Sequence, residues 1–87
     1  MTEFEKQMIT LIHERIERPG RRDKKASDKA AMETLIKGTD SEKQALIRKF
    51  INEEGLIAEV TTQISALNAR GVMLNALKAN MSAYVSS

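Results

Sequence analysis

The sequence predicts an all-α protein, a small bundle of three to four helices with a long C-terminal helix, associated with a second chain. Two patterns predict the helices. Apolar residues recur at spacings of three and four along most of the chain. Two Thr-x-x-Glu sequences, at Thr2 and Thr39, stand immediately before such periodic stretches and are typical of helix N-termini. With 87 residues, we expect a single domain covering residues 1–87.

The composition predicts a thin core. The chain has two Phe, one Tyr, no Trp and no Cys, so Leu, Ile, Val, Met and Ala must fill the interior. A core of this size contributes on the order of 3–5 kcal/mol of net stability. Without cysteine, neither disulfides nor thiolate metal sites can add to it. Association with a protein partner, as a homodimer or a heterocomplex, is the remaining way to stabilise the fold.

The first helix is expected over residues 3–18. Thr2 and Glu5 form a capping box, in which each side chain accepts a hydrogen bond from the other's backbone N–H. Pro19-Gly20 ends the helix, because proline disfavours the helical conformation of the residue before it. The residues on its apolar arc are Phe4, Met8, Leu11, Ile12 and Ile16.

A basic, solvated loop is expected over residues 19–26. The Lys and Arg side chains of this loop, with Arg15 and Arg18 before it, suggest contact with phosphates or with an acidic protein. The alternative is that they are simply solvated. No aromatic side chain is interleaved for base stacking, and nearby acids dilute the positive field. A nucleic-acid-associated function therefore ranks below protein binding. The candidate contact residues are Arg15, Arg18, Arg21, Arg22, Lys24 and Lys25.

A short helix is expected over residues 27–37, capped by Ser27-Asp28 and ended by Gly38. Its predicted buried side consists of Ala30, Ala31, Met32, Leu35 and Ile36. The second box, Thr39 to Glu42, opens a third helix over about residues 40–54. Its apolar arc consists of Leu46, Ile47, Phe50 and Ile51.

Gly55 leaves two possibilities open. It can end the third helix, or it can lie inside a helix that continues, or merely kinks, into residues 56–84 at a cost of roughly 1 kcal/mol. Continuity is favoured, because the apolar seam keeps its phase across Gly55 and no cap residue follows it.

The C-terminal stretch carries the predicted interaction surface. Its apolar residues form a coiled-coil-like seam that either packs on the rest of the chain or meets a partner. Residues 56–87 carry only Glu59, Arg70 and Lys78 as charges. After Gly71 the apolar residues spread off the seam, at Val72, Met73, Leu77 and Tyr84, so this stretch has more apolar surface than its companions can cover, and a partner contact is expected there first. The candidate interface residues are Ile57, Val60, Ile64, Leu67, Gly71, Leu74, Leu77, Met81, Tyr84 and Val85.

No pattern points to catalysis, a metal, a cofactor or a small-molecule substrate. His13 is the only histidine and cannot form a zinc site by itself. Glu53 and Glu54 are adjacent, and neighbouring helical residues point about 100° apart, so they do not converge as an acid pair. We therefore expect a non-enzymatic interaction module, such as an adaptor, a chaperone-like subunit or an inhibitor that acts by occlusion.

The expected location is the cytoplasm, without membrane insertion. Cysteine is absent, and residues 1–5 are acidic and lack the apolar core of a signal peptide. The polar residues from Glu59 to Asn80 argue against a transmembrane helix, because charges inside a bilayer are costly.

Overall fold

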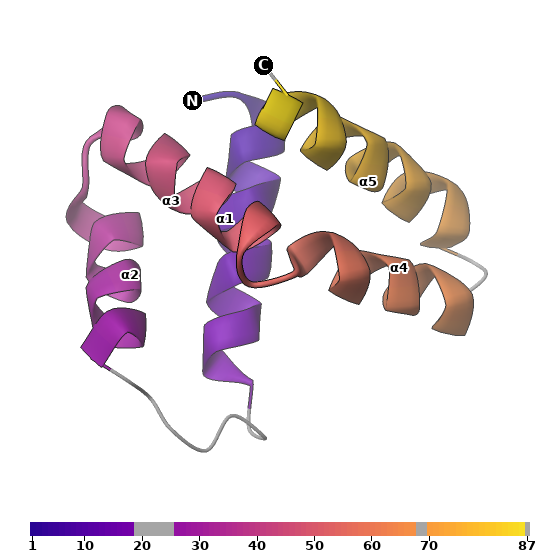
Figure 1. Cartoon of the computed structure of the whole chain (residues 1–87), viewed down its shortest axis with the longest axis horizontal. Coiled ribbons are helices and arrows are strands. Elements are labelled where there is room, and N and C mark those ends of the chain that lie inside the picture. The colour runs from indigo at the N-terminus through magenta and orange to yellow at the C-terminus, as the bar shows by residue number, and fades with distance from the viewer. Residues whose placement is uncertain (19–25, 68–69, 87) are drawn as a thin grey trace. The chain divides into compact units, whose positions relative to one another are not determined.

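A computed structural model describes residues 1–18, 26–67 and 70–86 (Figure 1). Within this range the predicted all-α class is confirmed, since the chain forms five helices and no strand. The helices are α1 (Glu3–Glu17), α2 (Ala26–Lys37), α3 (Asp40–Asn52), α4 (Leu56–Ala66) and α5 (Gly71–Ser86). The predicted basic loop, residues 19–26, lies outside the described residues apart from Ala26, which begins α2.

The chain divides into two compact units. The N-terminal unit, Met1–Ile47, contains α1, α2 and most of α3, with α1 packed against α2 (Figure 1). The C-terminal unit, Arg48–Ser87, contains the last turn of α3 and the helices α4 and α5, which pack side by side. The division falls inside α3, so one helix contributes residues to both units.

The capping box at the start of α1 is present. The Glu5 backbone N–H donates to the Thr2 hydroxyl at 3.1 Å, and the Thr2 N–H donates to the Glu5 carboxylate at 3.0 Å. The helix ends at Glu17, and Arg18 has the extended ψ of 130° that a following proline favours. The predicted apolar arc is buried at Met8, Ile12 and Ile16, which lie at helical spacing on one face.

The second capping box, at Thr39 and Glu42, is also present. The Glu42 N–H donates to the Thr39 hydroxyl at 3.2 Å, and the Thr39 N–H donates to the Glu42 carboxylate at 3.3 Å. This box begins α3, and the residues buried from it are Ile47, Phe50 and Ile51.

Two expectations about α2 are wrong. The helix begins at Ala26, so Ser27 and Asp28 lie in its first turn instead of capping it. Ala30 and Ile36 were expected on the buried side, but both are exposed, Ile36 by 67%. The buried stripe is narrow, formed by Ala31 and Leu35 one turn apart. Ala30 precedes this stripe and Ile36 follows it by one residue, which turns each about 100° away.

The favoured continuity of the helix through Gly55 is wrong. Helix α3 ends at Asn52, and Gly55 adopts the left-handed conformation, with φ 68° and ψ 34°, as the residue before α4. Glycine enters this region without the steric cost that a β-carbon imposes, and it is an acceptable N-cap. The helix restarts with the Glu59 N–H donating to the Gly55 carbonyl at 3.2 Å. The alternative, in which Gly55 ends the third helix, is therefore the correct one.

The long C-terminal helix over residues 56–84 is also wrong. Helix α4 stops at Ala66, and Leu67 leaves the helical region with φ −129° and ψ 75° while its N–H still donates to the Gln63 carbonyl. A new helix, α5, begins at Gly71 and lies beside α4 (Figure 1). The seam predicted along one long helix is thus folded back into a helical hairpin, formed by α4 and α5.

Candidate interaction surface

The ten candidate interface residues differ in how far they are buried. Val60, Leu74 and Met81 are buried within the chain, so they belong to the core instead of a free surface. Leu67 is exposed. The other six are intermediate in exposure: Ile57, Ile64, Gly71, Leu77, Tyr84 and Val85. The intramolecular interpretation therefore applies to these three seam positions, which the folded chain buries.

The most exposed large apolar side chains of the hairpin lie at the C-terminal end of α4 and at the N-terminal end of α5. Leu67 directly follows α4 and is 46% exposed, whereas Val72 and Met73 in the first turn of α5 are 88% and 73% exposed. We call these three residues the hairpin tip. Val72 and Met73 differ from Leu74 in their position around the helix, since Leu74 in the same turn is buried. Each residue step rotates the side chain by about 100°, so a turn with one buried member must expose others.

Val72 and Met73 are missing from the ten predicted interface residues. The sequence did mark them as apolar and off the seam, and that was the available signal. Eight of the ten candidate residues fit one helical stripe, and three of these eight, Val60, Leu74 and Met81, are buried. Val72 and Met73, which do not fit it, are the most exposed large apolar residues of the hairpin.

The hairpin carries little charge. Over residues 56–86 its charged side chains are Glu59, Arg70 and Lys78, of which Arg70 is exposed and close in sequence to the hairpin tip. Scattered single apolar residues are ordinary on protein surfaces, whereas apolar residues grouped in a weakly charged region are typical of interaction sites.

Tyr84 makes a contact within the C-terminal unit. The Arg48 guanidinium carbon, from the last turns of α3, lies 5.1 Å from the centre of the Tyr84 ring on α5. This cation–π geometry gives the aromatic face of Tyr84 a partner in its own chain. Among the predicted interface residues, Tyr84 is consequently less available than Leu67.

The basic candidates are only partly described. Arg21, Arg22, Lys24 and Lys25 lie outside the described residues. Arg15 is half-buried in the last turn of α1, where a cation complements the helix dipole, and Arg18 is exposed as the C-cap of that helix. Phosphate or acidic-protein contact by this group stays a prediction.

The polar residues weighed as catalytic or metal-binding candidates do not converge. His13 is exposed on α1, and Glu53 and Glu54 lie in the short segment between α3 and α4. Among the described residues, no three His, Cys, Asp or Glu side chains are grouped so as to hold a metal ion.

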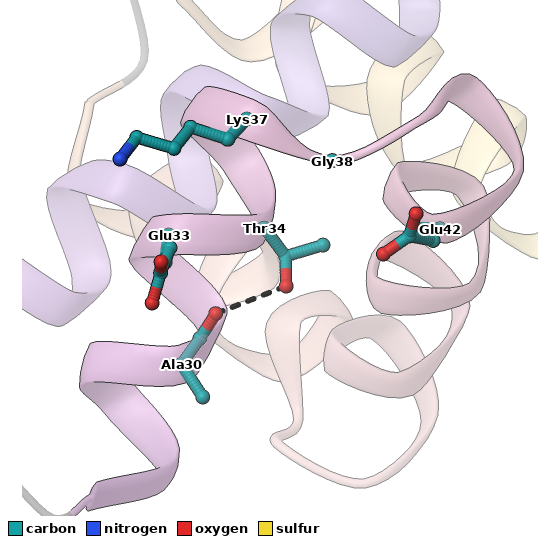
Figure 2. Close-up of a pocket in the computed structure, with 6 residues that line it drawn as sticks. All are labelled: Ala30, Glu33, Thr34, Lys37, Gly38 and Glu42. Carbon is teal, nitrogen blue, oxygen red and sulfur yellow. Dashed lines mark hydrogen bonds between the residues drawn. The ribbon is translucent and has the colours of Figure 1, made fainter.

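A surface depression of about 350 Å³ lies where α2 ends and α3 begins (Figure 2). The Thr34 hydroxyl is occupied, because it donates to the Ala30 carbonyl at 3.0 Å. The Glu42 carboxylate accepts from both the N–H and the hydroxyl of Thr39. Figure 2 shows Lys37 pointing away from Glu42 across the depression. The Thr34 hydroxyl and the Glu42 carboxylate of this depression are hydrogen-bonded within or next to their own helices. The polar groups of a small-molecule site would instead converge on a common point.

None of the helices in the described parts of the chain combines the length and apolar character needed to cross a membrane. No protein-family model, curated protein or solved structure matches this chain. Among the described residues, the hairpin tip holds three of the five large apolar side chains that are exposed.

Proposed function

We propose that this protein is a non-enzymatic protein–protein interaction module that associates with a second copy of itself through the α4–α5 hairpin. The observation that carries the proposal is the hairpin tip. Leu67, Val72 and Met73 are exposed together in a region with few charges, whereas the apolar residues of the adjoining seam are buried or half-buried. The half-buried Ile64 and Leu77 extend the apolar surface from the tip along both helices.

The expected association is weak. Burying an exposed Leu, Val or Met side chain yields about 1.5–3 kcal/mol, whereas association costs roughly 4–15 kcal/mol in lost freedom. Three such side chains from each copy contribute about 9–18 kcal/mol, a range that overlaps this cost. The exposed alanines of α5, Ala76 and Ala79, permit the close approach that would add dispersion contacts. We therefore expect a weak, concentration-dependent dimer, with a Kd on the order of 10 µM or more.

Sedimentation equilibrium over a wide protein concentration range tests the proposal. The informative variant is Val72→Glu, which places a charge in the hairpin tip. Residue 72 is in the first turn of α5, where a negative charge favours the helix, so the variant should stay folded. The expected result is a dimer for the unmodified protein and a loss of association of about tenfold or more for Val72→Glu.

The matched control is Ile36→Glu. Ile36 is also a highly exposed β-branched residue on a helix, but it belongs to the N-terminal unit and not to the hairpin. Equal loss of association in both variants would show a general effect of surface charge and contradict a contact at the hairpin tip. A protein that stays monomeric at every concentration would contradict self-association itself.

A further inference from the structure

The five methionines of the chain differ sharply in exposure. Met8 and Met81 are fully buried at 0%, and Met32 is half-buried. Met1 is 44% exposed at the start of the chain, and Met73 is 73% exposed in the hairpin tip. The most accessible thioether in the protein therefore lies in the surface through which the chain is proposed to associate.

We propose that Met73 is a peroxide-oxidation site and that its conversion to methionine sulfoxide turns off association through the hairpin tip. The first half of this inference stands on exposure alone, and the second half rests on the proposed function. In the reaction a lone pair of the Met73 sulfur attacks one oxygen of a hydroperoxide. The S–O bond forms as the O–O bond breaks, sulfur loses two electrons, and the other peroxide oxygen leaves as water or an alcohol after taking up the proton.

Exposure decides which methionine reacts first. Met81, eight residues further along the same helix, has no exposed surface, so peroxide reaches its sulfur only when the structure opens locally. Met73 needs no such opening. The two residues share a helix and a chemistry, which makes Met81 an internal reference for the reactivity of Met73.

The sulfoxide changes the chemistry of the tip. A flexible apolar side chain becomes polar, with an oxygen that water hydrogen-bonds strongly. The other two residues of the hairpin tip, Leu67 and Val72, have aliphatic side chains without a hydrogen-bond donor for that oxygen. Burying the sulfoxide against a second copy would therefore remove a hydrogen bond without replacing it, which weakens association by roughly tenfold or more.

Association should also slow the oxidation of Met73, because a dimer that covers the thioether keeps peroxide away from the sulfur until the contact opens. The rate of Met73 oxidation should consequently fall as the protein concentration rises through the Kd. The rate at Met1, which lies outside the hairpin, is not expected to change in the same way.

The first experiment measures which methionine is oxidised. The folded protein is treated with dilute hydrogen peroxide at low protein concentration, quenched with free methionine, digested, and analysed by mass spectrometry at each methionine. Oxidation of Met73 should exceed that of Met81 by at least roughly tenfold, because Met81 reacts only through opening. Equal rates at Met73 and Met81 would overturn the assignment of Met73 as the site.

The second experiment measures the consequence for association. Sedimentation equilibrium compares peroxide-treated wild type with peroxide-treated Met73→Leu, which keeps an apolar side chain but has no sulfur at this position. The expected result is dissociation of the wild type, retention of the dimer by Met73→Leu, and recovery of the wild type after treatment with methionine sulfoxide reductases. Dissociation of both proteins, or of neither, would overturn the switch.

The two experiments separate failure of this inference from failure of the proposed function. If untreated protein does not associate and Met73 oxidation is independent of concentration, the proposed function fails and the switch fails with it. The oxidation preference is still decided by the first experiment, which does not depend on a dimer.

Discussion

The guanidinium of Arg48 lies over the ring of Tyr84, with its central carbon 5.1 Å from the ring centre. Arg48 belongs to the last turns of α3 and Tyr84 to the last turns of α5, so the contact joins two elements of the C-terminal unit that are 36 positions apart in the chain. Tyr84 is the only tyrosine, and the chain has no tryptophan. The single large polar aromatic of the protein is thus engaged in an intramolecular contact.

Loss of this cation–π contact should lower the free energy of unfolding. Arg48→Met removes the charge and keeps much of the aliphatic stem, and we expect a decrease of about 0.5–1 kcal/mol at this exposed site. Tyr84→Phe keeps the aromatic face and should retain the effect of Arg48. The measurement is urea unfolding followed by circular dichroism, arranged as a double-mutant cycle with Tyr84→Leu, since both residues have other neighbours. A coupling energy near zero would show that the observed geometry contributes nothing.

Gly55→Ala should destabilise the protein. The residue has φ 68°, where a β-carbon costs roughly 1–2 kcal/mol, although no neighbouring atom lies within 4 Å to clash with it. Gly71→Ala is the matched control, because that glycine also has open space around it but begins α5 with ordinary φ. There the substitution should be neutral or stabilising by up to about 1 kcal/mol. Opposite signs in thermal unfolding are expected, and a stabilising Gly55→Ala would contradict the left-handed turn.

Gly38→Ala should destabilise for a different reason. A β-carbon at this position would lie 2.5 Å from the Thr34 backbone carbonyl oxygen, and this oxygen accepts the Gly38 N–H at 2.8 Å. The backbone must shift to make room, and we expect a cost of about 1–3 kcal/mol. Thr34→Ala in the Gly38→Ala background removes the side-chain contact at 3.0 Å but leaves the carbonyl in place. Full rescue by that second substitution would show that the backbone clash is not the cause.

Removal of either cap should cost helix stability. Thr2→Ala and Thr39→Ala each delete the hydroxyl that accepts a backbone N–H, and each should lower the free energy of unfolding by about 0.5–2 kcal/mol. Thr10→Ala is the control. Its hydroxyl donates to the Lys6 carbonyl within α1, and alanine there is the better helix former, so no loss is expected. Equal losses at all three positions in urea unfolding would argue against a specific capping contribution.

The starts of α1 and α3 and the end of α1 were predictable because they depend on local chemistry. A threonine hydroxyl and a glutamate three residues later satisfy each other's backbone groups whatever lies beyond them, and both boxes formed. Proline restricts Arg18 in the same local manner, and the observed ψ of 130° follows.

The breaks in the C-terminal half were not predictable in this way. A glycine within a helix costs only about 1 kcal/mol, which is less than the gain from burying one more aliphatic side chain. Gly55 and Gly71 are therefore compatible with a continuous helix or with a turn, and packing decides between them. In the folded chain α4 packs against α5, and Val60, Leu74 and Met81 are buried.

The candidate surface shows the same division. The sequence indicated that residues 56–87 are poor in charge and rich in apolar side chains, and it placed the contact first after Gly71, but the ten candidate residues left out Val72 and Met73. In the folded chain part of the seam is buried in the core, whereas Val72 and Met73 stay exposed.

By itself, then, the sequence determined the helical class, the positions of both capping boxes and the end of the first helix. The tertiary structure decided where the long apolar stretch turns and which of its faces stays exposed. The physical reason is the difference in scale. Capping and proline effects are set within four residues, whereas the choice between one long helix and a hairpin depends on apolar area buried between segments distant in the chain.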